Sequence, residues 1–241
     1  MREGIMGNLW TRFINKTADI GPIDKKLDER AQWLGDQSKL REYLRPRQVE
    51  GERLKVLSIG SSTGHEVDEI DSILEGVDIT TFDPTYDLTK PVKKRLAVPN
   101  KFGENTVRVL SKDVRAENLK GIKDGEMDAV TIFFVMHHMD GKQHEQVIAE
   151  IRRVLKEGGL LFVAEDIVGD KEEEKITVKA DRINNLEIFD DGEHNYRNEV
   201  EWKEFFLKQG FRLKEYNEVK PEKVRNGFFI LEKVKDLEQE N

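Results

Sequence analysis

The segment most able to do chemistry is a run of small residues, Gly60 to Gly64, within KVLSIGSSTGHEVDEI at residues 55–70. An apolar run precedes it, and apolar residues at helical spacing follow it. Small residues where a buried strand turns into a helix let a ligand approach the backbone closely. We therefore interpret this loop as a binding site, the alternative being an ordinary strand-to-helix turn.

Two carboxylates follow the next two apolar runs of the chain. Asp83 ends the second run, about 20 residues after the loop, where a carboxylate can accept hydrogen bonds from both hydroxyls of a ribose. Asp113 follows the third run, where its carboxylate can accept adenine amino protons while the Val114 N–H meets a ring nitrogen. Together with the loop, these positions predict a site for one adenosine.

Two adenosine-containing ligands compete for the loop, a dinucleotide and S-adenosylmethionine. The dinucleotide fingerprint is G-x-G-x-x-G, but Ser62 stands at its second glycine and His65 at its third. S-adenosylmethionine has no pyrophosphate and needs only a loop of small residues. The pattern therefore favours S-adenosylmethionine as the cofactor.

Histidines follow the fourth apolar run, at the level where a transferable group would lie. His137 is predicted to be a general base, because a histidine there can take a proton at neutral pH. The alternative is that one of His137 and His138 packs under the next helix and the other only shapes the pocket.

The polar segment DDGEHNYRNEVEW provides further candidates, His194 and Tyr196, which we place in the catalytic site as acceptor-recognition residues. The alternative is a connection in which Asn198 caps a helix and Trp202 fills the core. Glu165 and Asp166 end the fifth apolar run, but two adjacent carboxylates without a clear third ligand are weak evidence for a metal. No metal site is predicted.

Short apolar runs must position these residues. Five runs alternate with helical segments between residues 54 and 165: LKVLSI, VDITTF, TVRVLS, DAVTIFFV and LLFVAE. Apolar residues at consecutive positions are typical of strands covered on both faces, and right-handed crossovers arrange such strands as a doubly wound sheet. One intervening helix is expected to end at Gly158 and Gly159, and a shorter one to begin near Pro91.

The ends of the chain depart from this alternation. FRLKEYNEV at 211–219 and GFFILEK at 227–233 predict an antiparallel hairpin at the sheet edge, after a short helix ended by Gly210. Residues 1–50 carry apolar side chains at helical spacing and predict a helical extension or lid. Residues 51–241 are expected to form one cofactor-binding domain, with an insertion at 167–198 that contains a helix around 172–187.

The ordered set VLSIGSSTG, TFDP, SKDV, FFVMHHMD and LKEGGLLFVAED resembles class I S-adenosylmethionine-dependent methyltransferases, particularly the small-molecule type with an LHH-like motif after the fourth strand. The resemblance covers roughly residues 54–166 and implies a Rossmann-like, mostly parallel seven-stranded α/β sheet. It implies cofactor contacts by Gly60, Ser62 and Gly64 to the methionine part, Asp83 with Pro84 to the ribose, Asp113 and Val114 to adenine, and Phe134 near the sulfonium. Ser58 departs from the acid that usually opens the family's first motif.

Composition narrows the function further. A net charge of -8 over 241 residues argues against a general nucleic-acid binder, and the longest apolar run, AVTIFFVM, is too short to cross a bilayer. The chain has no cysteine, which fits a reducing compartment and an expected cytoplasmic location. We expect methyl transfer to an O, N or C atom of a small molecule; an RNA or protein acceptor, or a non-catalytic cofactor sensor or scaffold, are alternatives, and the oligomeric state is open.

Overall fold

The computed structural model describes residues 32–61, 64–84, 105–111, 113–184, 194–220 and 224–235. By internal packing the chain divides into unit 1, residues 1–115, and unit 2, residues 116–241. The predicted helix near Pro91, Ser62 of the loop and the predicted helical residues before 32 lie outside the described residues. Among the described residues, no helix combines the length and the apolar character that crossing a bilayer requires.

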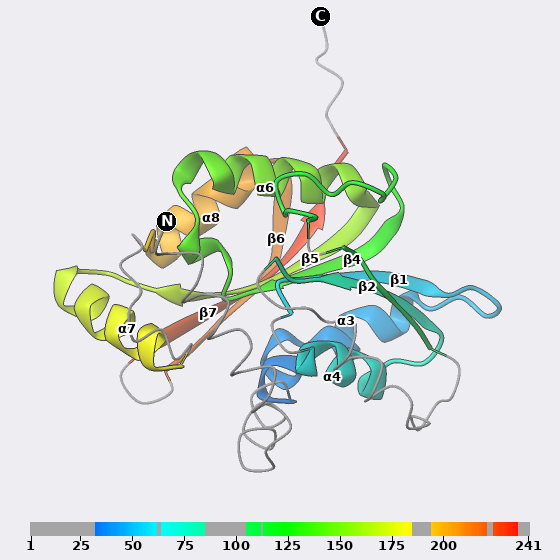
Figure 1. Ribbon diagram of the computed structural model, residues 1–241, viewed down its shortest axis with the longest axis horizontal. Helices are drawn as coiled ribbons and strands as arrows, with labels where there is room; N and C mark the ends of the chain where they lie inside the picture. Colours follow the sequence, from blue (N-terminus) through cyan, green and yellow to red (C-terminus); the bar gives the residue numbers. More distant parts are fainter. Residues whose placement is uncertain are drawn as a thin grey trace, which may run out of the picture. The chain divides into compact units, whose positions relative to one another are not determined.

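The strands form a seven-stranded sheet in the order β3-β2-β1-β4-β5-β7-β6 (Figure 1). Their bounds are β1 Leu54–Ile59, β2 Val77–Phe82, β3 Thr106–Val109, β4 Met127–Phe133, β5 Leu155–Ile167, β6 Phe211–Val219 and β7 Arg225–Lys233. The pairs β1/β2, β2/β3 and β4/β5 are parallel, whereas β7 is antiparallel to both β5 and β6. The predicted mostly parallel sheet and its C-terminal antiparallel hairpin are confirmed.

Unit 1 carries β1, β2 and β3 with the helices α3 Leu40–Leu44, η1 Arg45–Arg47 and α4 His65–Ile73. Residues 32–38 are also helical, in agreement with the helical extension expected before residue 50. Five of the six β1 residues are buried, which explains their consecutive apolar side chains. On α4, Val67 and Ile70 are buried while the acidic residues of its first turn favour the helix start.

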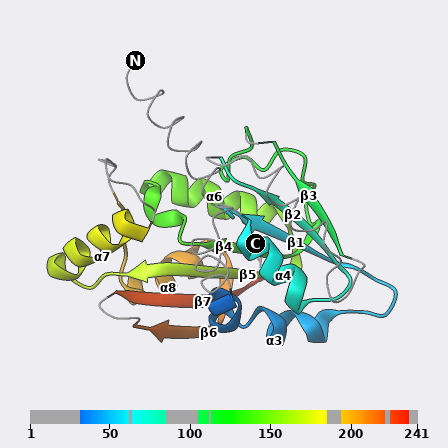
Figure 2. The ribbon, with the colours of Figure 1, turned by 60° about the horizontal axis from the view of Figure 1, so that its bottom comes forward.

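Unit 2 carries the other four strands with η2 Met136–His138, α6 Gly141–Val154, α7 Lys171–Asn184 and α8 Glu199–Lys208. The rings of His144 on α6 and Trp202 on α8 lie 5.4 Å apart, so these helices pack beside each other on one face of the sheet (Figure 1). Figure 2 shows β5, β7 and β6 side by side and α7 beyond the end of β5. Asp140 and Asn198 each close a capping box at the start of α6 and α8.

The predicted helix stop at Gly158 and Gly159 is wrong. Helix α6 already ends at Val154, and Leu155 is extended and begins β5. Pairing of Leu155 with Met127 draws the chain directly from helix into strand, and the register shifts before Leu160. Gly158, with φ at +72°, lies in that irregular stretch of the strand, where its freedom serves a bulge and not a helix end.

Candidate functional site

The loop after β1 has the backbone that its glycines predict. Gly60 and Gly64 adopt φ of +72° and +87°, in the left-handed region that favours glycine. The Gly60 N–H donates to the Phe82 carbonyl at 3.1 Å, and the Gly64 N–H donates to the Ser61 carbonyl at 2.7 Å. Gly64 is also the N-cap of α4, with no side-chain cap, so the start of this helix faces the loop.

Three hydroxyl groups linked by hydrogen bonds fix the loop to the two strands that precede and follow it. The Oγ atoms of Ser58 and Ser61 lie 3.1 Å apart, and Ser61 Oγ also bonds Thr81 Oγ1. These contacts join the end of β1, the loop and the end of β2. Ser58, which stands where related motifs carry an acid, is completely buried and fixes the loop itself.

Three parallel strands bring the predicted adenosine-binding residues to one edge of unit 1. Ile59 pairs with Phe82, and Thr81 pairs with Val109, so Gly60 and Asp83 follow their strands at the same level. Asp83 is buried, whereas Pro84 and Asp113 are exposed. Asp113 lies two residues after Ser111, in a turn that hydrogen bonds to the Ser111 hydroxyl define. The strand register therefore places Gly60 and Asp83 at one edge of unit 1, and Asp113 stays a prediction as an adenine contact.

The Val114 N–H, predicted to contact an adenine nitrogen, donates to the Ser111 carbonyl at 3.0 Å. A ring nitrogen would have to share or replace this bond. Val114 therefore stays a prediction as an adenine contact.

Unit 2 places His137 in a fully buried pair with Glu165. His137 Nδ1 lies 2.7 Å from Glu165 Oε2, and both side chains have no exposed area. The other carboxylate oxygen of Glu165 accepts from the Val135 and Met136 N–H groups, at 3.0 and 2.6 Å. One side chain at the end of β5 thus fixes both the turn η2 and the orientation of the His137 ring.

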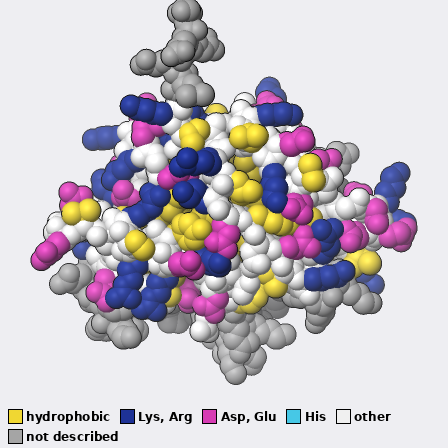
Figure 3. Space-filling view, turned by 180° about the vertical axis from the view of Figure 1, so that it is seen from behind, with side chains coloured by type: hydrophobic (Ala, Val, Ile, Leu, Met, Phe, Trp, Pro, Cys, Tyr) yellow, Lys and Arg dark blue, Asp and Glu magenta, His cyan; other side chains and the backbone are white. Residues whose placement is uncertain are grey.

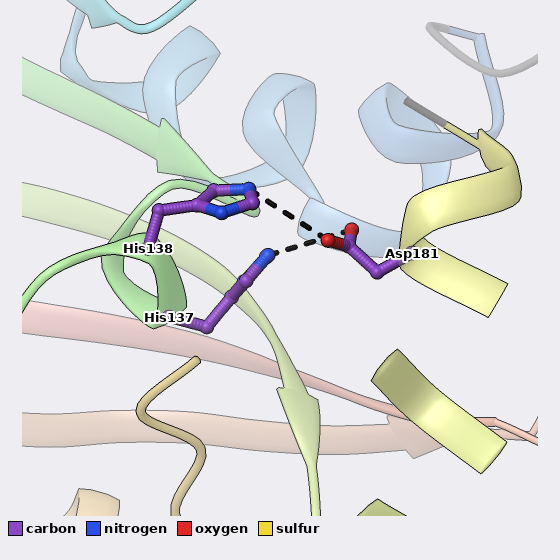
Figure 4. Close-up of side chains that lie close together, drawn as sticks. All are labelled: His137, His138 and Asp181. Atoms are coloured by element: carbon purple, nitrogen blue, oxygen red, sulfur yellow. Dashed lines mark ion pairs between the residues drawn. The ribbon is translucent and has the colours of Figure 1, made fainter. Parts of the chain in front are cut away.

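Asp181, which projects from α7, faces His137 and His138 (Figure 4) and also contacts His194. Asp181 Oδ1 lies 3.5 Å from His137 Nε2, and Oδ2 lies 3.9 Å from His138 Nε2 and 3.2 Å from His194 Nε2. The His194 and Tyr196 rings stack, with centroids 5.6 Å apart, and Tyr196 also stacks on His137 at 5.3 Å. The structure brings all three sequence-predicted catalytic residues, His137, His194 and Tyr196, into one cluster.

Opposing effects set the protonation of this cluster. Burial disfavours a charged His137, but the Glu165 and Asp181 carboxylates outweigh it and raise the pKa of His137 to about 10. Burial and the neighbouring His137 instead lower the pKa of His138 to about 4. Burial, with Asp181 second, raises the pKa of Tyr196 above its usual range. At neutral pH the cluster therefore contains a charged His137, a neutral His138 and a neutral phenol.

Phe134, predicted to lie near the sulfonium, follows β4 with φ at +55°. A non-glycine residue in this region is strained, and such strain is concentrated at functional sites. Its N–H donates to the Ala164 carbonyl at 2.8 Å, which holds the turn against β5. The backbone at this position is thus bent and fixed directly before η2.

Both interpretations of the segment around residue 196 apply, but to different residues. Asn198 caps α8 and Trp202 is completely buried, as the structural alternative predicted. Arg197 belongs with them, because its guanidinium reaches the His144 ring and lies over Trp202. His194 and Tyr196 turn instead toward His137.

Sequence reasoning missed Asp181 and the role of Glu165. Asp181 lies in a helix outside every motif, and nothing local signals its partners. Glu165 was considered only together with Asp166, whose carboxylate bonds to the Asn226 side chain at 2.6 Å. The pairing of strand β5 with its neighbours, and not the adjacency of these two residues, separates their roles.

Comparisons with known proteins agree with this geometry. The model of a methyltransferase domain family matches residues 57–163. A solved S-adenosylmethionine-dependent methyltransferase from Methanosarcina mazei superposes with a TM-score of 0.60 at 19% identity, covering 80% of this chain and 98% of that one. Residues 57–163 are thus similar to a methyltransferase domain family, and the solved structure shares the fold of this chain.

Other solved structures share the fold of this chain. The Burkholderia thailandensis 1,6-didemethyltoxoflavin-N1-methyltransferase, solved with its substrate and S-adenosylhomocysteine, has a TM-score of 0.63 at 15% identity and covers 97% and 89% of the two chains. The [4+2]-cyclase SpnF has a TM-score of 0.58 at 15% identity and covers 83% and 81%. At such identities the likeness shows the fold alone. No curated protein matches this sequence.

Proposed function

We infer that this protein transfers the methyl group of S-adenosylmethionine to an O, N or C atom of a small molecule. The observation that carries the acceptor half of the proposal is the cluster of the His137, His194 and Tyr196 rings in unit 2. A cluster of polar rings contributed by one unit suits an acceptor of limited size better than an extended chain. The Burkholderia relative, which was solved with bound 1,6-didemethyltoxoflavin, supports this acceptor class.

Surface charge supports the same acceptor class. Lys and Arg side chains are interspersed with Asp and Glu over the face in Figure 3. RNA binding depends on a basic patch or stripe that neutralises phosphates. The mixed charges of this face, with the net charge of -8, favour a small acceptor over RNA.

In unit 1, the proposed cofactor contacts follow from the strand ends. The backbone at Gly60, Ser62 and Gly64 would pass the methionine part, and the Asp83 carboxylate, with Pro84 beside it, would accept from the ribose hydroxyls. Asp113 and Val114 would contact adenine. In unit 2, the bent backbone at Phe134 would line the sulfonium.

The cofactor supplies the activation for methyl transfer, so the protein chiefly aligns the nucleophile in line with the departing sulfur and excludes water. The pKa of His137, near 10, argues against a ring that removes a proton from the acceptor at neutral pH. His194 and Tyr196 would pack against the acceptor. An acceptor that arrives without a proton on its nucleophilic atom fits this arrangement best.

Calorimetry with S-adenosylmethionine and S-adenosylhomocysteine tests the cofactor half, and the absence of binding by both would end the proposal. The acceptor half is tested with a methyl-labelled cofactor and separate small-molecule, RNA and protein fractions of a cell extract. We expect label in the small-molecule fraction. Label in RNA or protein would replace the acceptor class, and cofactor binding without any labelled product would favour a sensor.

A further inference from the structure

Two histidine nitrogens and one carboxylate face each other at the end of β4 in unit 2. They are His137 Nε2, His138 Nε2 and an Asp181 oxygen, and these ligand atoms lie within 4.8 Å of one another. Figure 4 shows both rings directed at the carboxylate from the turn η2, with Asp181 reaching in from α7. Tetrahedral ligands about 2 Å from a zinc ion lie about 3.4 Å apart, close to the 3.5 Å between His137 Nε2 and Asp181 Oδ1.

His137 supplies the most deeply buried of these three ligand atoms. His137 has no exposed side-chain area, and its Nε2 makes no hydrogen bond of good geometry among the residues that the structure describes, Asp181 Oδ1 lying 3.5 Å away. Nearly all such buried polar atoms are well hydrogen-bonded, so this loosely paired nitrogen calls for an explanation. This nitrogen and the ligand nitrogen of His138 both point toward the Asp181 carboxylate.

Supporting contacts repeat the pattern found around metal-bound histidines. A metal-bound histidine usually donates its other ring N–H to a carboxylate, which fixes the tautomer and the ring orientation. Glu165 Oε2 takes this place, 2.7 Å from His137 Nδ1. His194 Nε2 lies 3.2 Å from Asp181 Oδ2 and orients the carboxylate in the same way.

Charge favours a cation at this point. Glu165 is completely buried and the side chain of Asp181 is only 8% exposed, so two carboxylates lie near the group with little solvent. Buried carboxylates need a positive partner, and a bound cation supplies it once His137 has lost its proton to become a ligand. Imidazole nitrogens suit zinc, copper, nickel and iron, whereas Mg²⁺ and Ca²⁺ prefer oxygen ligands.

We propose that His137 Nε2, His138 Nε2 and the Asp181 carboxylate form a binding site for one divalent transition-metal ion. Binding displaces to solvent any proton carried by a ligand nitrogen. Three protein ligands leave a fourth position for water, the pattern of catalytic zinc sites. The His138 side chain, 34% exposed, marks the side on which an ion enters.

The experiment titrates chelator-treated, full-length protein with ZnCl2 by calorimetry and with CoCl2 by visible absorption. We expect one equivalent of each ion to bind and the Co²⁺ form to show the d–d bands of a low-coordinate nitrogen and oxygen site. Asp181→Asn and His138→Ala should each weaken binding at least tenfold. Glu165→Gln should weaken it by about tenfold, because it alters only the support of His137.

Glu172→Gln is the matched control, since Glu172 lies on the same helix as Asp181 but is exposed. It should bind Zn²⁺ as the wild type does. No saturable binding by the wild type, or equal binding by the Asp181→Asn and His138→Ala variants when circular dichroism shows them folded, would overturn the proposal. The outcome is independent of cofactor binding, so it is distinguishable from failure of the proposed function.

Discussion

The loop at Gly60–Gly64 in unit 1 and the cluster around His137 in unit 2 reach their geometry by different routes. The loop is a run of consecutive residues, and the left-handed backbone at Gly60 and Gly64 follows from glycine at those two positions. The cluster draws on Glu165 at the end of β5, Asp181 in α7 and two residues before α8. A local site can be found by its motif, whereas a site assembled from distant segments depends on the packing of each segment.

Loss of the Glu165 side chain should have the largest effect on the cluster. Glu165→Ala leaves the Val135 and Met136 N–H groups and the His137 ring without their acceptor, and should lower the free energy of unfolding by about 3 to 5 kcal/mol. Urea unfolding measures this. Glu165→Gln keeps an acceptor and should lose clearly less; equal losses would show that the carboxylate does not organise the turn.

Loss of the Asp83 side chain should instead affect ligand affinity in unit 1. Asp83→Ala should weaken S-adenosylhomocysteine binding about 100-fold, because two charge-assisted hydrogen bonds to the ribose disappear. Calorimetry measures the change. Asp78→Asn is the control on the same strand, because Asp78 bonds Arg53 and Thr106 instead. If both variants bind equally well, Asp83 does not contact the ribose.

A methyl group on the loop tests whether its backbone conformation matters. Gly64→Ala puts a side chain at φ +87° and should lower the free energy of unfolding by about 1 to 2 kcal/mol. Gly141→Ala is the matched control at the start of α6, where an added Cβ meets nothing within 4 Å. Thermal unfolding should show a loss for the first variant and no loss for the second, and equal curves would contradict the required left-handed turn.

The smallest expected effect on stability concerns Arg225, which links α7 to the C-terminal hairpin. Arg225 on β7 donates to both carboxylate oxygens of Glu218 on β6, at 2.8 Å each, and to Glu173 on α7 at 3.3 Å. The hydrogen bond from Arg225 outweighs burial and holds the pKa of Glu218 below its usual range. A carboxyl whose pKa is lower in the folded chain stabilises the fold above its unfolded pKa and loses this contribution as the pH falls.

Wild-type protein should therefore lose more stability than Glu218→Gln as the pH falls through 4.5, by less than about 1 kcal/mol. Thermal unfolding between neutral and acidic pH measures this difference. Parallel pH profiles for the two proteins would show that the pair does not contribute to holding the hairpin.

The sheet was predictable because burial acts on each strand separately. Five strands lie where apolar runs predicted them and two where the hairpin was predicted, although β5 begins five residues before its predicted start at Leu160. That start depends on the pairing of Leu155 with Met127, a contact between segments far apart in the sequence. The helix end predicted at Gly158 was misplaced for the same reason, because this pairing of Leu155 ends the helix earlier.

The sequence by itself determined the approximate positions of the strands and the loop of small residues, and it supplied the candidate cofactor residues, because backbone conformation and strand burial depend mainly on local residue types. It also identified His137, His194 and Tyr196 as candidates. Only the tertiary structure decided that Asp181 faces His137 and that Glu165 fixes the ring. These contacts join η2, α7 and the end of β5. The charges that set the protonation of His137 act through space, so the distance between residues along the sequence does not reveal them.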